Sequence, residues 1–99
     1  MKKDEFQVIY NNVLFAELEE LKLYRPLGIG ECCKHPNAMG CYQDKDGWWN
    51  VYETDDWQHV IVRARLEEES AFDMLYEEII GTIHKERERR NNRKNKEAM

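Results

Sequence analysis

The spacing of apolar residues changes twice along this chain, and this change limits the folds that it can adopt. Between residues 5 and 24, apolar side chains recur at every third or fourth position, as on one face of a helix. From residue 39 to residue 66 the period is two, as in strands with one buried face. Helical spacing returns from residue 67 to residue 83. The pattern therefore predicts an α+β fold in the order helix, sheet, helix.

The central segment predicts a three-stranded antiparallel β-meander, because two tight-turn sequences, Asp44–Gly47 and Thr54–Trp57, divide it. In the last strand, Val60, Val62, Ala64 and Leu66 alternate with Ile61, Arg63 and Arg65. The irregular segment 26–37 could hold one more short strand, within Ile29–Cys33. The three expected strands are Met39–Gln43, Trp48–Glu53 and Gln58–Leu66.

The two expected helices flank this sheet. Asp4 is the expected N-cap of the first, and Pro26 ends it, since a residue before proline avoids the helical region. The second begins at the acidic run from Glu67 and keeps its apolar stripe to Ile83. Residues 84–99 are charged, so we expect a frayed or projecting basic tail after one compact domain over residues 1–83. Both helices would cover one face of the sheet and leave the other open.

The length and charge of the chain limit the classes of protein to which it can belong. Ninety-nine residues make one domain, and no apolar run approaches the roughly 18 residues that span a bilayer. No signal sequence is recognisable, so we expect a cytoplasmic protein without a membrane segment. The net charge of −5 divides into −9 over residues 1–83 and +4 over residues 84–99. An acidic body repels nucleic acid and attracts basic proteins, or it serves solubility alone.

The cysteines and one histidine lie close together in the sequence. Cys32, Cys33, His35 and Cys41 could in principle bind a soft metal, but adjacent cysteines rarely ligate one ion together. A nucleophile pair of Cys33 and His35 would lack a third group to orient it. We therefore expect reduced thiols, and neither a metal, a cofactor nor a catalytic residue.

Acidic residues gather in the two predicted turns: Asp44 and Asp46 in one, and Glu53, Asp55 and Asp56 in the next. Successive turns of a meander lie at opposite ends of the sheet, so these residues form two patches. The run Asp-x-Asp-Gly lacks the later glutamate of a calcium loop. The carboxylates are either polar turn residues or acidic patches that face a partner protein.

Aromatic residues are concentrated in the same segment. Strand alternation places Trp49 and Val51 on the core face, and it places Trp48 and Tyr52 on the opposite face, available to a partner. Trp57 falls in the second turn. Exposed tryptophan and tyrosine commonly dominate the energetics of protein interfaces, so Trp48, Tyr52 and Trp57 are candidate anchors.

Three segments carry a resemblance to a known class of proteins: Gly40-Cys41-Tyr42, the run from Asp46 to Thr54 that contains Asp-Gly-Trp-Trp-Asn-Val-Tyr, and Ser70-Ala71-Phe72-Asp73-Met74-Leu75. A glycine–tyrosine strand that leads to such a hairpin, a further strand and an acidic, alanine-containing helix start resembles small immunity proteins of bacterial polymorphic-toxin systems. The match covers roughly residues 38–83.

This resemblance implies a non-catalytic antidote that binds and neutralises a cognate toxin domain, frequently a nuclease. A nuclease groove is basic because it holds phosphate, so an acidic inhibitor would complement it. Whether the protein also forms a homodimer through its uncovered sheet face stays open. The alternative is a small adaptor domain whose basic tail contacts nucleic acid. The candidate partner-binding residues are Glu53, Asp55, Asp56 and Trp57, followed by Trp48, Tyr52, Asp44 and Asp46.

Overall fold

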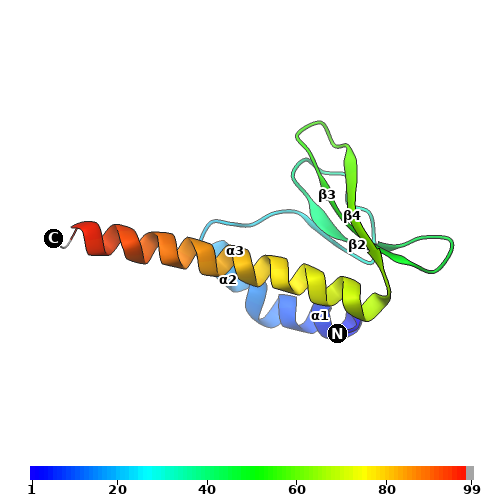
Figure 1. The fold of residues 1–99 in the computed structure, drawn as a ribbon, viewed down its shortest axis with the longest axis horizontal. Coiled ribbons are helices and arrows are strands. Elements are labelled where there is room, and N and C mark those ends of the chain that lie inside the picture. The colour runs from blue at the N-terminus through cyan, green and yellow to red at the C-terminus, as the bar shows by residue number, and fades with distance from the viewer. Residues whose placement is uncertain (98–99) are drawn as a thin grey trace.

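The chain folds into a four-stranded mixed sheet with helical segments along one side of it (Figure 1). The computed structural model describes residues 1–97. The N-terminal helical segment and the long C-terminal helix meet the same face of the sheet, as expected. In chain order the elements are α1 (Lys3–Ile9), η1 (Tyr10–Leu14), α2 (Phe15–Glu20), β1 (Leu27–Ile29), β2 (Met39–Gln43), β3 (Trp49–Thr54), β4 (Val60–Leu66) and α3 (Glu68–Glu97).

The first helix contains one π-helical turn, η1, between α1 and α2. Its buried residues Phe6, Tyr10, Leu14 and Leu18 are spaced by four. At 3.6 residues per turn, a spacing of four drifts about 40° around the helix at each step, so the last of them would leave the core face. The wider π turn takes up this drift and keeps all four side chains on one face.

The start of this helix differs from the prediction. The helix begins at Lys3, so Asp4 lies in its first turn and is not the N-cap. Lys2 occupies the cap position and makes no side-chain hydrogen bond. The carboxylate of Glu68, at the start of α3, accepts a hydrogen bond from the Lys3 backbone N–H at 2.9 Å instead. The cap therefore comes from a residue distant in sequence.

The sheet has the order β1-β2-β3-β4. The predicted antiparallel meander is present as β2, β3 and β4, but the expectation of three strands was incomplete. The extra strand β1 pairs in parallel with β2 and lies at Leu27–Ile29, so it ends where the possible short strand Ile29–Cys33 was expected to begin. The pairing depends on glycine, because a Cβ on Gly40 would lie 2.1 Å from the carbonyl oxygen of Gly28.

Phe72 stands at the centre of the core. Its ring centroid lies 5.5 Å from that of Phe6 in α1 and 5.1 Å from that of Trp49 in β3. Trp49 and Val51 are buried, which confirms their assignment to the core. Aromatic contacts therefore join both helical segments to the sheet through one residue of α3.

The opposite face of the sheet is not open along β3, contrary to the prediction. The connection from β1 to β2 crosses this face, and the hydroxyl of Tyr52 donates to the Glu31 carbonyl at 2.9 Å and accepts from the Cys33 N–H at 2.6 Å. Thr54 holds the same segment through the His35 carbonyl and the Ala38 N–H. Tyr52 is 1% exposed, so it is not available to a partner.

Strand β4 is the exposed part of the sheet. Val60, Ile61 and Val62 are 37%, 42% and 46% exposed, so side chains from both alternating sets are exposed at the start of this strand. The β3–β4 hairpin extends away from the helices (Figure 1), so no helix covers the start of β4. A bulge between Val51 and Tyr52 also shifts the register within this pair.

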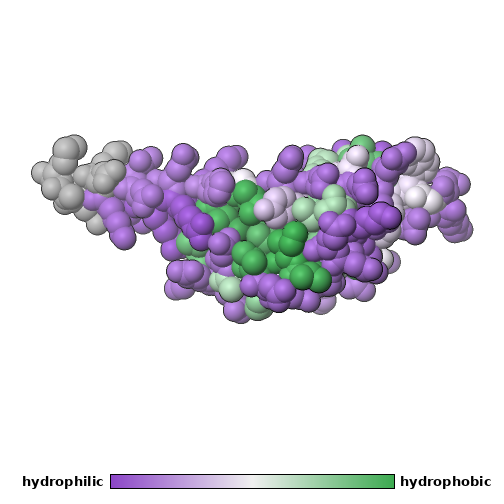
Figure 2. Space-filling view, turned by 90° about the horizontal axis from the view of Figure 1, so that it is seen from below, coloured by the Kyte–Doolittle hydropathy of each residue, from purple (hydrophilic) through white to green (hydrophobic). Residues whose placement is uncertain are grey.

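Helix α3 continues well past the last apolar position, Ile83, and remains helical to Glu97. Arg87 forms an ion pair with Glu17 at 3.4 Å, and Arg90 donates to the Leu21 carbonyl at the end of α2. The start of the basic segment is therefore docked on α2, and the rest projects as a hydrophilic arm (Figure 2). Residues 98 and 99 of the predicted tail lie outside the described residues.

Figure 2 shows an apolar area over the helices on the underside, and Val8 and Val13 of the first helix are exposed. No helix within residues 1–97 is both long enough and apolar enough to cross a membrane.

Gly81 gives a direct test of the α3 geometry. A Cβ added there meets nothing within 4 Å, so Gly81→Ala should raise the free energy of unfolding by about 1 kcal/mol. Gly47 has φ +90°, so Gly47→Ala should lower it by about 1 kcal/mol. Urea unfolding monitored by circular dichroism measures both. A loss of stability in the Gly81 variant would contradict the open helix surface.

Candidate functional site

The two hairpin tips have the same construction. In each, one aspartate begins the turn and its Oδ1 accepts two backbone N–H groups, two and four residues further on. Asp44 accepts from Asp46 and Trp48 at 3.0 and 3.1 Å. Asp55 accepts from the Trp57 and His59 N–H groups at 2.9 and 2.8 Å. The tips are therefore ordered by their own carboxylates, as in other aspartate turns.

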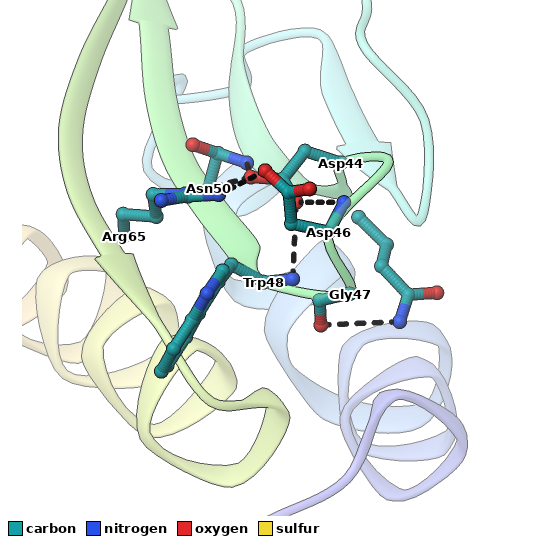
Figure 3. A network of polar contacts seen from close by, with 7 residues as sticks. Asp44, Asp46, Gly47, Trp48, Asn50 and Arg65 are labelled. Atoms are coloured by element: carbon teal, nitrogen blue, oxygen red, sulfur yellow. Dashed lines mark hydrogen bonds and ion pairs between the residues drawn. The ribbon is translucent and has the colours of Figure 1, made fainter.

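The first tip is also tied to the body of the sheet (Figure 3). Arg65 of β4 donates to Asp44 at 2.8 Å and to Asp46 at 3.0 Å, and Asn50 donates to Asp44 at 3.1 Å. The Arg65 guanidinium holds the pKa of Asp44 well below its usual range, with help from the Asn50 and backbone donors. It also lies 5.7 Å from the ring centroid of Trp48. Three predicted partner-binding residues thus belong to one internal network.

The second tip projects freely. Trp57 is 80% exposed, while the Asp55 carboxylate beneath it also contacts the His59 ring at 3.1 Å. The His59 and Trp57 backbone donors, together with that ring, lower the pKa of Asp55. Gln58 has φ +69°, a left-handed conformation that is uncommon outside glycine and that collects at functional sites.

The remaining acidic candidates also have partners within the chain. Asp56 accepts from the Asn37 amide at 2.9 Å, and Glu53 pairs with Arg63 across the β3–β4 ladder. The structure brings Glu53, Asp56 and Trp57 to one end of the sheet, together with Asp55. It places the Asp44 network at the other end, in agreement with the prediction of two patches.

Sequence reasoning missed the apolar surface beside Trp57. Val60, Ile61 and Val62 are three aliphatic residues in succession, and all three are exposed. Such a run breaks the alternation of a half-buried strand, and this was the signal that could have revealed it. Together with Trp57 these residues form a surface that we call the hairpin surface.

The cysteines do not form a site with His35. Cys41 is buried against α3, where its thiol lies 3.6 Å from the Ala71 carbonyl, and burial raises its pKa to about 12. Cys32 and Cys33 lie in the crossing segment, and all three thiols are free. Within residues 1–97 no group of three histidine, cysteine or acidic side chains is placed to hold a metal ion.

The hollows of the surface differ in size and lining. An apolar hollow between α2 and β1 measures about 30 Å³, room for little more than one water molecule. A larger, open groove of about 410 Å³ runs beside the first tip, between Trp48 and the start of α3 at Glu67. The hairpin surface lines neither of these two hollows, and the hairpin that carries it extends away from the helices (Figure 1).

The Asp44 network predicts acid sensitivity. The pKa of Asp44 is lower in the folded chain than the ordinary value of about 3.9, so its stabilisation is complete above about pH 4 and is lost as the pH falls towards the folded pKa. Asp44→Asn should therefore be less stable than the unmodified chain at pH 7, and the difference in melting temperature should narrow as the pH falls below about 4. Melting temperatures across this range measure the difference. Asp46→Asn, which removes one exposed contact, should shift them less.

The contribution of the two Tyr52 hydroxyl hydrogen bonds to stability can be tested by removing that hydroxyl. Tyr52→Phe leaves the Glu31 carbonyl and the Cys33 N–H without their partner, and should lower the free energy of unfolding by about 1–3 kcal/mol. Tyr24→Phe is the control, because Tyr24 is 56% exposed and should change the stability by less than about 0.5 kcal/mol. Equal, small effects in urea unfolding would exclude a structural role for the Tyr52 hydroxyl.

Comparison with known proteins leaves the function to be argued from this geometry. No family model, no curated protein and no solved structure matches the chain. The feature that carries most information is the hairpin surface, because it combines a rigid turn, an exposed tryptophan and an aliphatic strand.

Proposed function

We propose that this chain is a non-catalytic immunity protein, which acts in the cytoplasm by binding and neutralising a cognate bacterial toxin domain. The single observation that carries the proposal is Trp57, 80% exposed at the tip of a turn that the Asp55 carboxylate holds in place. Support also comes from the resemblance of residues 38–83 to such proteins. The binding surface is the hairpin surface, with Asp56 beside it.

A tryptophan in this setting suits an anchor for a partner protein. Large aromatic side chains provide much of the binding free energy of protein interfaces when they become buried. Asp55 accepts hydrogen bonds from the backbone of both Trp57 and His59, so the turn is ordered before the partner arrives. Less conformational entropy is then lost on binding, and more of the contact energy appears as affinity.

The acidic body favours a basic partner. Residues 1–83 carry a net charge of −9, and this field acts over a longer range than the local ion pairs of Glu53 and Asp44. An acidic protein is attracted to a basic groove, such as one that holds a phosphate backbone, and association is then faster. A nuclease domain is therefore the kind of toxin that fits best. In this proposal charge guides the approach and Trp57 anchors the complex.

Growth rescue tests the proposal. The C-terminal domain of the protein encoded immediately upstream is expressed with and without this chain, and the chain should restore growth by forming a complex. Trp57→Ala should weaken that complex by about 30-fold or more, which corresponds to about 2 kcal/mol. Tyr24→Ala is the matched control, since Tyr24 is an exposed aromatic residue away from the hairpin surface.

Other outcomes decide against the proposal. A harmless upstream domain, or toxicity that the chain leaves unchanged, would contradict neutralisation. Equal affinity of the Trp57 and Tyr24 variants would place the interface elsewhere. Salt-sensitive retention on nucleic acid that is lost when residues 84–99 are removed would favour the adaptor function, in which the basic arm makes the contact.

A further inference from the structure

One face of helix α3 carries a charge pattern that the proposed function does not use. Helix residues spaced by three, four or seven positions lie on the same face. The residues of this face, which we call the α3 stripe, are Glu69, Asp73, Tyr76, Ile80, Arg87 and Lys94. The stripe is therefore acidic at its start, apolar at its middle and basic at its end.

The two halves of α3 have opposite net charges. Residues 68–83 include five acidic residues and no lysine or arginine, whereas residues 84–97 include seven basic and three acidic residues. Two ion pairs with other elements reduce this difference without removing it, because Asp73 pairs with the Met1 ammonium group and Arg87 pairs with Glu17. One charge on each half is neutralised in this way, and the signs of the two halves stay the same.

The ends of the stripe have charges that a partner can use. Glu69 and Lys94 are exposed, and neither forms an ion pair among the side chains that the structure describes. The hydrogen bond to Asp73 raises the pKa of the Met1 amine, and the nearby carboxylates of Glu5 and Glu69 raise it further. Carboxylates therefore outnumber the one ammonium group that they surround at this end.

The basic end of α3 extends beyond the body of the chain. Arg90 donates to the Leu21 carbonyl, which marks the end of α2 along this helix. Residues 91–97 continue the helix for about 10 Å past this contact, and none of them is apolar. A short helical segment that is polar all round has little stability of its own. An acidic surface laid against this segment would stabilise it.

The apolar middle of the stripe adjoins the first helix. The contacts of Phe6 with Phe72 and of Glu17 with Arg87 show that the two helical segments run side by side in the same direction. Val13 lies between these contacts along the chain, and it is 49% exposed. Figure 2 shows an apolar area in the middle of this underside, with hydrophilic residues on both sides of it along the long axis.

We propose that two copies of this chain form a symmetric dimer in which their α3 helices pack antiparallel across this apolar area. A two-fold axis midway between Glu69 and Lys94 is also midway between Tyr76 and Arg87, and it passes close to Ile80. Each Glu69 then faces Lys94 of the second copy, and each Arg87 guanidinium lies near a Tyr76 ring.

Only an antiparallel arrangement satisfies both ends of the stripe. It lays the basic end of each helix along the acidic start of the other, whereas a parallel dimer would bring like charges together. The β3–β4 hairpin extends away from the helices, so the hairpin surface stays accessible in the dimer (Figure 1). Dimerisation therefore involves only the chain itself and does not depend on a toxin partner.

Charge reversal tests the orientation of the helices, with sedimentation equilibrium of the full chain over a range of concentrations as the measurement. Glu69→Lys and Lys94→Glu should each weaken the dimer at least about tenfold, because each places two like-charged pairs in the interface. The variant with both changes should dimerise about as tightly as the unmodified chain. Glu31→Lys and Lys34→Glu are the matched controls, since both residues are exposed in the segment between β1 and β2.

A substitution in the apolar area tests the face itself. Val13→Lys should weaken the dimer at least about tenfold, because it buries an ammonium group. Ile61→Lys is the matched control: Ile61 is a similarly exposed aliphatic residue on β4, and its substitution should leave the dimer intact. Circular dichroism checks that every variant is folded.

Several results would overturn the proposal. A monomer at every concentration would exclude the dimer, and a dimer that survives Val13→Lys or that Ile61→Lys breaks would place the interface on another face. Failure of the combined Glu69 and Lys94 reversal to restore the dimer would exclude the antiparallel arrangement. Because no toxin is present in these measurements, their failure leaves the growth-rescue result untouched.

Discussion

The outer layer of this fold depends on one buried hydroxyl. The Oη of Tyr52 lies between the Glu31 carbonyl and the Cys33 N–H, and so fixes the segment that crosses from β1 to β2. The ring can lie there only because Gly28 beneath it has no side chain; a Cβ would lie 2.2 Å from that hydroxyl. Gly40 allows the same close approach between β1 and β2. The parallel pairing of β1 with β2 and the covered face of β3 both follow from this arrangement.

This dependence explains which parts of the fold could be predicted. The helices and the antiparallel meander follow from local periodicity, which each segment carries in its own sequence. Strand β1 has three residues and no alternation of its own, so its pairing becomes apparent only with Gly40 and Tyr52 in place. The burial of Tyr52 has the same origin: alternation placed it correctly on the face opposite Trp49, but could not show that a loop covers that face.

The sequence predicted where the candidate site residues lie better than it predicted which groups their carboxylates contact. The sequence places acidic residues in two turns, and the structure confirms two groups at opposite ends of the sheet. It could not show that Arg65, about twenty residues from Asp44, neutralises the first turn, or that the Asp55 carboxylate is engaged by the backbone of its own turn. The prediction ranked the acidic residues first as partner contacts, whereas the structure gives more weight to Trp57, which is exposed at the end of a hairpin that extends away from the helices (Figure 1).

The continuous helix α3 separates charge along the molecule. Its 30 residues extend about 45 Å, and the chain measures 56 Å in its longest dimension. The acidic body lies at one end and the basic arm at the other, so the molecule has a large electric dipole moment along this axis. A positively charged surface exerts a torque on such a dipole, and turns the body towards itself and the arm away. Orientation would thus precede contact, within the roughly 8–10 Å over which physiological salt leaves such fields unscreened.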